Sequence, residues 1–271
     1  MPGAGTRLVG VIGHPVRHSL SPRLHNTAFR ALGLDWVYLA FDVPPGEVPA
    51  TLAAVRALDL AGLNVTMPHK ADVAAGVDRL SPAAAALRAV NTVVNRGGEL
   101  FGDNTDGEGF VASLGDSGFD PAGRRCLVLG AGGAARAVVR ALGSAGAERV
   151  SVWARREEAA GAAASMTPVG RTGALAEAAE AHLVVNATPV GMGADTRLPL
   201  DPDLLHAGQT VVDLIYDPAT TPLLAEASRR GAVVANGAGM LVHQAALAFA
   251  LWTGLPPPVD QMRSMLGEGL N

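Results

Sequence analysis

Lys70 closes a segment, residues 62–70, that reads Gly-Leu-Asn-Val-Thr-Met-Pro-His-Lys, with an apolar start followed by polar side chains. We expect a strand to run here into a loop and then a helix, the kind of junction at which α/β enzymes gather their chemistry. A lysine in such a place can exchange a proton with a hydroxyl or carbonyl oxygen. The alternative is a solvated lysine in the first helical turn, since lysines usually lie in water.

Other polar side chains stand where a partner or a ligand is needed. Ser19 lies in a polar loop ahead of a helix and has no capping role there, whereas Ser21 followed by Pro22 fits the N-cap of that helix. Asn91 lies within an apolar strand expected over 89–95, and burying an amide unpaired costs about 1–3 kcal/mol. Asn91 therefore either ties down a loop or lines a site.

Asp106 and Gln244 each allow two interpretations. Asp106 precedes Gly107 in a loop expected over residues 102–110, which are rich in glycine and short polar residues, so it is either an N-cap or a site residue. Gln244 interrupts an apolar helix expected over 240–252, where it either satisfies a neighbour or points into a pocket.

A glycine-rich loop follows the apolar strand expected over 125–129 and opens an alanine-rich helix, with the spacing G-x-G-x-x-A. The first glycine allows a tight turn and the second lets the backbone approach a pyrophosphate, whose charge the helix N-terminus attracts. A second strand over 149–153 supplies the context that this motif requires. The sequence therefore predicts a dinucleotide site that includes Gly130, Ala131, Gly132, Gly133 and Ala134.

The end of that second strand indicates which dinucleotide is bound. NAD sites usually place an acidic residue there for the ribose hydroxyls, whereas the extra phosphate of NADP calls for arginine. This chain has Ala154-Arg155-Arg156, so we predict NADP. The alternative is that Arg155 and Arg156 only balance Glu157 and Glu158 on a helix surface.

Three further strands, expected over 182–188, 210–214 and 233–235, each end in a loop. Loops at the carboxyl ends of neighbouring strands converge on the crevice in which a dinucleotide lies. We expect Thr188, Leu214 and Gly237 to contribute contacts to the nicotinamide and ribose.

The elements that position these residues alternate along the chain. Strands are expected over 8–13, 37–43 and 61–65, with a helix from Ser21 and another over 48–58. This alternation is typical of βαβ units and a largely parallel sheet.

Composition narrows the class of protein. The 271 residues are 49% hydrophobic and 17% charged, with a net charge of −4, which suits a compact enzyme and not a nucleic-acid or anionic-membrane surface. Cys126, the single cysteine, lies in an apolar run, so we expect a core residue and neither a disulfide nor a thiolate metal site. Without a signal peptide or a long apolar span, we expect a cytoplasmic protein that acts on small molecules.

Taken together and in order, these motifs resemble the shikimate dehydrogenase family from the first strand to the closing helix. The segments that carry the resemblance are His18-Ser19-Leu20-Ser21-Pro22 with His25-Asn26, residues 64–70, Ala89-Val90-Asn91-Thr92, residues 102–107, Ala187-Thr188-Pro189-Val190-Gly191-Met192, Asp213-Leu214-Ile215-Tyr216 and residues 237–244.

The resemblance implies an α/β fold of two domains. An N-terminal α/β substrate domain would comprise residues 1–106 with the C-terminal helices of 241–271, and a Rossmann NADP-binding domain would comprise residues 107–240. It also implies roles: Ser19 and Ser21 would hold a substrate carboxylate, Lys70 and Asp106 would form an acid/base pair, and Tyr216 would contact substrate from the cofactor side. The residues implied around the ring hydroxyls of the substrate are Asn64, Thr66, Asn91, Asp106 and Gln244.

The implied reaction is the NADP-dependent, reversible reduction of 3-dehydroshikimate to shikimate in aromatic amino-acid biosynthesis, by a monomer or homodimer. A carbonyl reduction needs a hydride and a proton, so a positioned lysine suits it. Neither this chemistry nor the family requires an ion, so we predict no metal site from His14, His18, His25 and His69.

One departure from the family bears on the cofactor. The family commonly has Asn-Arg-Thr where this chain has Ala154-Arg155-Arg156, which keeps one arginine but changes its neighbours. A quinate/shikimate or aminoshikimate dehydrogenase that uses NAD or both cofactors is therefore an alternative. A non-catalytic nucleotide-sensing protein is a more distant one, which the presence of Lys70 and Asp106 disfavours.

Overall fold

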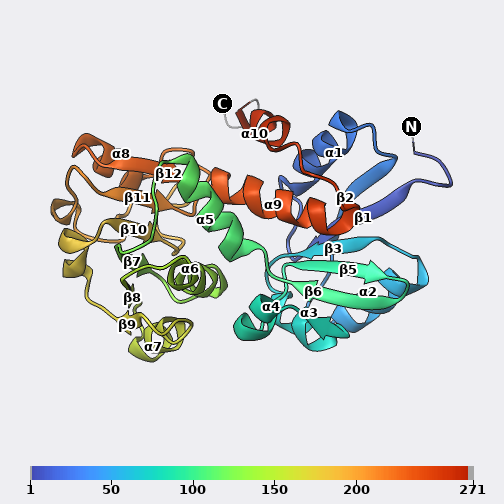
Figure 1. Cartoon of the computed structure of the whole chain (residues 1–271), viewed down its shortest axis with the longest axis horizontal. Coiled ribbons are helices and arrows are strands. Elements are labelled where there is room, and N and C mark those ends of the chain that lie inside the picture. The colour runs from blue at the N-terminus through green and yellow to red at the C-terminus, as the bar shows by residue number, and fades with distance from the viewer. Residues whose placement is uncertain (1, 268–271) are drawn as a thin grey trace. The chain divides into compact units, whose positions relative to one another are not determined.

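The computed structural model describes residues 2–267, which fold into two compact units, each with its own six-stranded sheet (Figure 1). The first unit holds the chain up to Thr105 and again from Gln244, and the second holds Asp106 to His243. In the order of the chain, the second unit is therefore an insertion within the first. The end of the segment 241–271 lies outside the described residues.

The sheet of the first unit is mixed. Its strands are β1 (Arg7–Gly13), β2 (Trp36–Asp42), β3 (Gly62–Val65), β4 (Arg79–Leu80), β5 (Thr92–Arg96) and β6 (Glu99–Asp103), in the order β2-β1-β3-β5-β6-β4. β1 pairs in parallel with β2 and β3, as the alternating pattern predicts. β5 and β6 instead form an antiparallel hairpin, and β5 also pairs antiparallel with β3.

The hairpin explains where the sequence-based expectation differs from the structure. Gly97 and Gly98 form its turn with φ angles of 62° and 95°, which side chains would strain. The strand after this turn was not expected, because residues 102–110 were interpreted as one loop, and β6 runs to Asp103.

Helices cover both faces of this sheet. They are α1 (Ser21–Ala31), α2 (Val48–Ala57), α3 (Lys70–Gly76), α4 (Pro82–Leu87), α10 (Val259–Gly267) and the later part of α9 (Ala238–Thr253). On one face, α2 packs Leu52 and Val55 into a core with Ile12 and Leu63. On the other, aromatic rings of α1, β2 and α9 pack together, with the His25 and Tyr38 rings stacked at 4.4 Å.

The helix start at Ser21 corrects one expectation. Leu20, with helical backbone angles, holds the N-cap position, and Ser21 is already the first residue of α1 and makes no cap. Ser19, from which no capping role was expected, accepts a hydrogen bond from the Ser21 backbone N–H at 3.3 Å. The chain turns into the helix one residue earlier than expected, so the helix end does not require the Ser21 hydroxyl.

The second unit is a parallel sheet of the Rossmann type. Its strands are β7 (Arg125–Leu129), β8 (Arg149–Trp153), β9 (Gly170–Thr172), β10 (Leu183–Asn186), β11 (Thr210–Asp213) and β12 (Val233–Asn236). The described strands lie in the order β12-β11-β10-β7-β8-β9, and every pair is parallel. Counted from β7, this is the order 3-2-1-4-5-6 of dinucleotide-binding folds, read in reverse.

Helices also cover both faces of the second sheet. They are α5 (Asp106–Asp116), α6 (Gly133–Ser144), α7 (Glu157–Ala164), α8 (Pro222–Arg229), the first part of α9, and the short 3-10 helices η1 (Leu175–Glu180) and η2 (Pro202–Leu204). Cys126 and Val128 of β7 face a core shared with α5, α6 and α7, whereas Leu127 and Leu129 face one shared with η1 and α8. Burial raises the pKa of the Cys126 thiol to about 12, as befits the core residue expected there.

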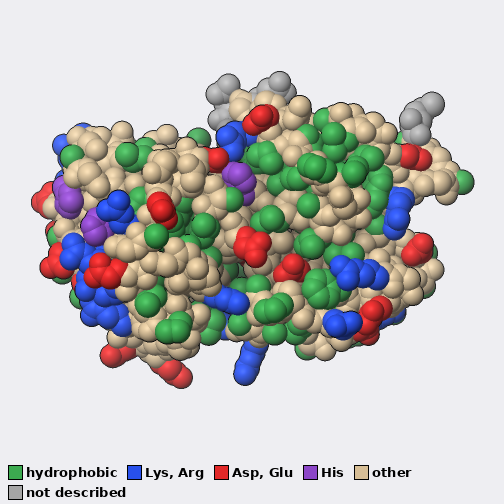
Figure 2. Space-filling model, viewed as in Figure 1, with side chains coloured by type: hydrophobic (Ala, Val, Ile, Leu, Met, Phe, Trp, Pro, Cys, Tyr) green, Lys and Arg blue, Asp and Glu red, His purple; other side chains and the backbone are tan. Residues whose placement is uncertain are grey.

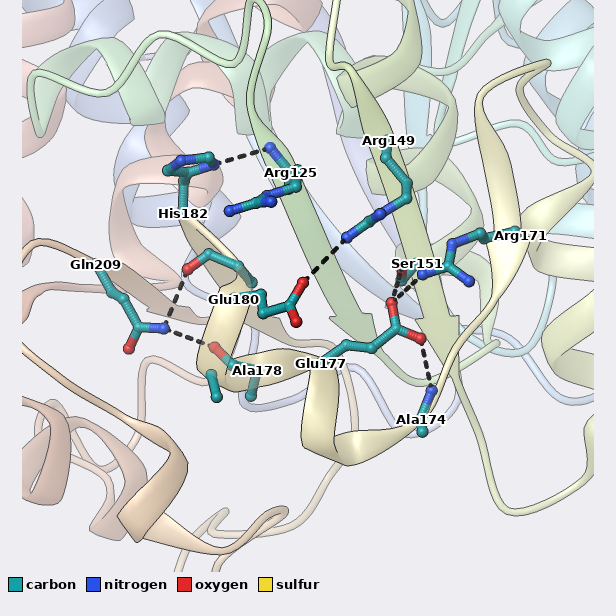
Figure 3. Close-up of polar contacts among 12 residues, drawn as sticks. Arg125, Arg149, Ser151, Arg171, Ala174, Glu177, Ala178, Glu180, His182 and Gln209 are labelled. Atoms are coloured by element: carbon teal, nitrogen blue, oxygen red, sulfur yellow. Dashed lines mark hydrogen bonds and ion pairs between the residues drawn. The ribbon is translucent and has the colours of Figure 1, made fainter.

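Glu177 fastens η1 to the neighbouring strands (Figure 3). Its carboxylate accepts hydrogen bonds from Ser151 at 2.7 Å, Arg171 at 2.5 Å and the Ala174 N–H at 3.1 Å. Burial alone would raise its pKa, but these bonds and the nearby arginine charges outweigh burial and lower it. The ionised Glu177 carboxylate therefore holds η1 against β8 and β9 and has a structural role.

The surface carries charges of both signs. On the face drawn in Figure 2, basic side chains stand among acidic ones, and exposed arginines such as Arg229 and Arg171 pair with glutamates. No helix in the described part of the chain has the length and apolar character needed to cross a bilayer.

Candidate functional site

Lys70 stands where the sequence places it, at the junction of a strand and a helix. β3 ends at Val65, and α3 begins at Lys70 after a four-residue loop. The buried His69 holds this loop through a 2.7 Å contact from Nε2 to the Val43 carbonyl. Lys70 itself is half-buried, and its backbone carbonyl accepts a hydrogen bond from the Val90 N–H at 2.9 Å. Lys70 therefore adjoins Val90 and Asn91, the two residues that precede β5.

Asn64 makes three hydrogen bonds inside the first unit. It is buried on β3, its amide nitrogen donates to the Asn91 carbonyl and to Thr92 Oγ1, both at 3.1 Å, and its Oδ1 accepts from the Tyr38 hydroxyl at 2.7 Å.

Asn91 ties down a loop, one of the two roles that the sequence allowed. It precedes β5 and is not inside it; its Oδ1 accepts from the Thr105 N–H at 2.9 Å, and its Nδ2 donates to Thr105 Oγ1 at 2.9 Å. Thr105 Oγ1 in turn donates to the Gln244 carbonyl at 3.1 Å. Asn64, Asn91 and the α9 backbone at Gln244 thus belong to one buried network.

The remaining first-unit candidates lie near the ends of β1 and β3. Ser19 and Thr66 are half-buried, and Ser21 is buried with its hydroxyl within hydrogen-bonding reach of Tyr38. A side chain at Gly13 would come within 2.4 Å of the Thr66 methyl group, so the glycine allows the two loops to approach.

Two of the proposed substrate residues belong to the second unit. Asp106 is buried in the first turn of α5, which approaches α6 so closely that a side chain at Gly107 would meet the Ala137 carbonyl at 2.9 Å. Tyr216 is half-buried in the loop after β11, and burial together with the Asp217 charge raises its pKa.

Asp213 orders the Tyr216 loop, and it is a residue whose part in the site we did not predict. Its carboxylate accepts from Thr221 at 2.7 Å, Asn186 at 3.0 Å and the Ile215 N–H at 3.1 Å. Burial raises the pKa of Asp213, and these hydrogen bonds oppose that effect. A polar residue closing an apolar strand was the signal, the same one that drew attention to Asn91.

A pocket of about 940 Å³ opens at the carboxyl ends of β7, β8 and β10, within the size range of cofactor sites. Gly130 turns here with a φ of 115°, and a side chain on it would meet the Ala187 carbonyl at 2.7 Å. Gly132 occupies the N-cap of α6 without a capping side chain, so backbone N–H groups at this helix end are open to an anion. These features fit a pyrophosphate.

Six of the predicted cofactor residues line this pocket. They are Gly130, Ala131, Gly132, Arg155, Arg156 and Thr188. Gly133 and Ala134 form the first turn of α6 beside it. Leu214 and Gly237 are not in its lining and pack on each other, since a side chain at Gly237 would meet the Leu214 carbonyl at 2.0 Å.

The charged side chains of the pocket lining are all arginines, namely Arg155, Arg156 and Arg197. Arg155 and Arg156 are exposed, and in the described part of the chain neither forms an ion pair with Glu157 or Glu158, so the surface-balance alternative gains no support. Arg197, which the sequence did not suggest, binds Asp195 through Nε and a terminal nitrogen at 2.9 and 2.8 Å. This lining suits an additional phosphate and fits NADP.

The histidines weighed as metal ligands have other surroundings. His14 pairs with Asp42 at 2.8 Å, and His25 lies among aromatic rings. Within residues 2–267, no three His, Cys, Asp or Glu side chains cluster in a way that would hold an ion.

Two family profiles match the chain. One is described as the shikimate dehydrogenase substrate binding domain and covers residues 11–93, and the other as the shikimate 5'-dehydrogenase C-terminal domain and covers residues 237–264.

Similar proteins cover nearly the whole chain. A shikimate dehydrogenase (NADP+) from Symbiobacterium thermophilum is 49% identical over 272 residues, which span 95% of this chain and 92% of that protein. A solved shikimate dehydrogenase in complex with NADP+ superposes with a TM-score of 0.95 at 35% identity, covering 100% of this chain and 98% of that one. The Thermus thermophilus enzyme in complex with NADP(H) and shikimate gives 0.92 at 43% identity, covering 97% and 99%.

Proposed function

The chain belongs to the shikimate dehydrogenase family of NADP-dependent oxidoreductases, and from this premise we propose that it reduces 3-dehydroshikimate reversibly to shikimate. We assign substrate binding to residues 1–106 with 241–271, and NADP binding to residues 107–240. The observation that carries the cofactor assignment is the pocket beside α6, with an uncapped helix N-terminus and only arginines as charged lining residues.

The NADP phosphates would be held by two parts of the pocket. The N–H groups at the start of α6 would bind the pyrophosphate, and Arg155 with Arg156 would bind the phosphate on the adenosine ribose. NADP in its reduced form supplies the hydride for the carbonyl carbon. Thr188, Leu214 and Gly237 would line the path toward the nicotinamide.

The substrate would be bound by neutral hydrogen-bonding groups. Ser19 and Ser21 hydroxyls would donate to the carboxylate, which needs no arginine. Asn64, Thr66, Asn91 and Gln244 would surround the ring hydroxyls, and Tyr216 would approach from the cofactor-binding unit. The buried network that joins Asn64, Asn91 and the Gln244 backbone supports this assignment, because it fixes three of these positions relative to one another.

Lys70 and Asp106 would together supply the proton for the reduction. The Lys70 ammonium would donate to the oxygen that becomes the alcohol, and the Asp106 carboxylate would orient that ammonium. Two hydrogen-bonded steps support the pairing: the Lys70 carbonyl accepts from Val90, and Asn91, the next residue, holds Thr105, which directly precedes Asp106.

Steady-state kinetics with a matrix of substrates and cofactors tests the function. We expect turnover of shikimate with NADP+ to exceed every other combination of shikimate, quinate or aminoshikimate with NADP+ or NAD+. Quinate or aminoshikimate turnover above that of shikimate would favour the alternative dehydrogenases, and absence of turnover with retained NADP+ binding would favour a nucleotide sensor.

We further propose that the protein works in the cytoplasm, as a monomer or homodimer. The buried thiol of Cys126 is compatible with a reducing compartment, because the fold does not depend on a disulfide. Size-exclusion chromatography with light scattering decides the oligomeric state.

A further inference from the structure

Tyr38 is a fully buried residue without a role in the reaction proposed above. It lies on β2, its side chain has no exposed surface, and its ring stacks on His25 with only 7° between the planes. Its hydroxyl lies 2.7 Å from Asn64 Oδ1, and the Ser21 hydroxyl lies within hydrogen-bonding reach of the Tyr38 hydroxyl. Tyr38 therefore connects two residues proposed to bind opposite ends of the substrate.

The hydrogen bonds of Asn64 fix which way its amide points. The Asn91 backbone carbonyl, 3.1 Å away, can only accept, so the atom facing it must be the amide nitrogen. The second amide hydrogen goes to Thr92 Oγ1, whose own hydrogen goes to Asn91 Oδ1 at 2.9 Å. Asn64 Oδ1 must then face Tyr38, and Tyr38 must be the donor.

In this orientation, the Asn64 side chain can only accept a hydrogen bond from a ligand. Both of its N–H groups are used within the protein. Its carbonyl oxygen accepts from Tyr38, and the nearby His25 ring nitrogens make no hydrogen bond within the described residues, so the oxygen keeps a second lone pair. Asn64 can therefore accept a hydrogen bond from a ligand hydroxyl and cannot donate one. The arrangement depends on Tyr38, because without its hydroxyl the oxygen would lose the donor that holds it in this buried position.

We propose that Tyr38 is a positioning residue of the substrate site, which holds Asn64 so that its carbonyl oxygen accepts from one ring hydroxyl of the substrate. This inference rests on the proposed function and assigns a polarity to one of its contacts. A substrate that offers a hydroxyl donor at that ring position is selected over one that offers only an acceptor or no polar group.

Tyr38→Phe tests the proposal, because it removes the hydroxyl and keeps the stacked ring. We expect KM for shikimate to rise roughly 5- to 10-fold, with kcat reduced less than threefold and the Kd of NADP+ unchanged. Trp252→Phe is the matched control: it removes a buried hydrogen bond, 2.9 Å to the Val93 carbonyl, from the same aromatic cluster without touching Asn64. This control should leave KM at the wild-type value.

The outcomes separate the inference from the function on which it rests. Asn64→Ala serves as the reference, and its KM for shikimate should rise at least as far as that of Tyr38→Phe. If Asn64→Ala raises KM but Tyr38→Phe does not, or if Tyr38→Phe and Trp252→Phe raise it equally, the positioning role is wrong and the function stands. If Asn64→Ala also leaves KM for shikimate unchanged, Asn64 does not bind the substrate, and both its assignment and this inference are wrong.

Ligand analogues test the same idea on the wild-type protein, should the Tyr38 variant fail to fold. For the ring position that Asn64 contacts, the deoxy analogue and the fluoro-deoxy analogue should both bind about tenfold more weakly than shikimate, because neither has a proton to donate. A fluoro-deoxy series in which every analogue binds as well as shikimate would overturn the acceptor role of Asn64.

Discussion

Lys70 is the only lysine in the chain, whereas the other 20 of its 21 Lys and Arg residues are arginines. Arginine stays protonated under all ordinary conditions, so it supplies charge and hydrogen bonds but no proton. The use of arginine everywhere else and of lysine only at the strand-to-helix junction agrees with the proposal that an amine there releases and regains a proton. The composition thus supports the proposed acid role independently of the motif around Lys70.

Substitution of Lys70 separates proton transfer from charge. Lys70→Arg keeps the positive charge, so if the proton matters we expect kcat to fall about 10²- to 10⁴-fold, close to the loss in Lys70→Met. The Kd of NADP+ should not change in either variant. Arg79→Met, which removes an exposed cation from β4 of the same unit, is the control and should retain full activity. A Lys70→Arg enzyme with nearly wild-type kcat would show that charge alone is required.

Single residues were predictable where their type is unusual for their place. Asn91 in an apolar stretch and the arginine pair that follows β8 are examples, and the structure gives both a partner or a pocket. Tyr38 gave no such signal, because a tyrosine in a strand is ordinary, and only the three-dimensional pairing of β1 with β2 and β3 brings it to Asn64. Arg197 was missed for the same reason, since its relation to Arg155 arises only in the folded pocket.

The parallel strands were the most predictable elements. β7 and β8 begin and end at the expected residues, because each is an apolar run between turns, and the glycine-rich loop leads from β7 into α6. The antiparallel β6 was missed because its glycine and its single buried leucine give no clear alternation. The start of α1 was misplaced by one residue. Ser21 before Pro22 fits the pattern of an N-cap followed by proline, but Ser21 is the first helical residue and Leu20 holds the N-cap position.

Thr221 offers a test of how the cofactor-binding unit holds the loop that carries Tyr216. It is the N-cap of α8 and accepts from the Leu224 N–H at 3.3 Å, while it also donates to Asp213. Thr221→Val should lower the free energy of unfolding by about 1–2 kcal/mol in urea titrations at pH 7, whereas Thr221→Ser should retain most of it.

The pH dependence of this loss has a definite sign. The pKa of Asp213 is already raised in the folded protein, so its contribution to stability is present at low pH and is lost as pH rises through the folded pKa. Removing the Thr221 donor should raise that pKa further. The stability deficit of Thr221→Val should therefore be smaller near pH 4 than at pH 7, and a deficit that grows on acidification would contradict the link to Asp213.

For the molecule as a whole, the order of motifs along the chain was enough to identify the family and its two-domain fold. Relatives that match 95% or more of the chain agree with that identification. Local propensity alone would not have indicated that the chain leaves one unit and returns to it, because residues 106 and 244 lie in helices with no linker between the units. The resemblance supplied that information, since it relates distant segments to one another.

His25 should make the stability of the whole protein sensitive to acid. Burial lowers its pKa from 6.5 to about 3, and this effect is larger than the opposing one of the nearby Asn64 side chain. The unfolded chain binds a proton at His25 below about pH 6.5 and the folded chain does not, so the free energy of unfolding should fall as the pH drops from there toward 3. The slope from this residue approaches about 1.4 kcal/mol per pH unit.

Comparison with His25→Phe isolates this contribution from that of the carboxylates. Phenylalanine keeps an aromatic ring against Tyr38 and does not titrate, so the wild-type protein should lose stability relative to the variant on acidification between pH 6.5 and 4, as measured by urea unfolding at each pH. A stability difference that does not change with pH would mean that His25 is protonated in the fold. A charged His25 would then lie against the Tyr38 ring, and the buried side of the proposed substrate site would have to be polar enough to solvate this charge.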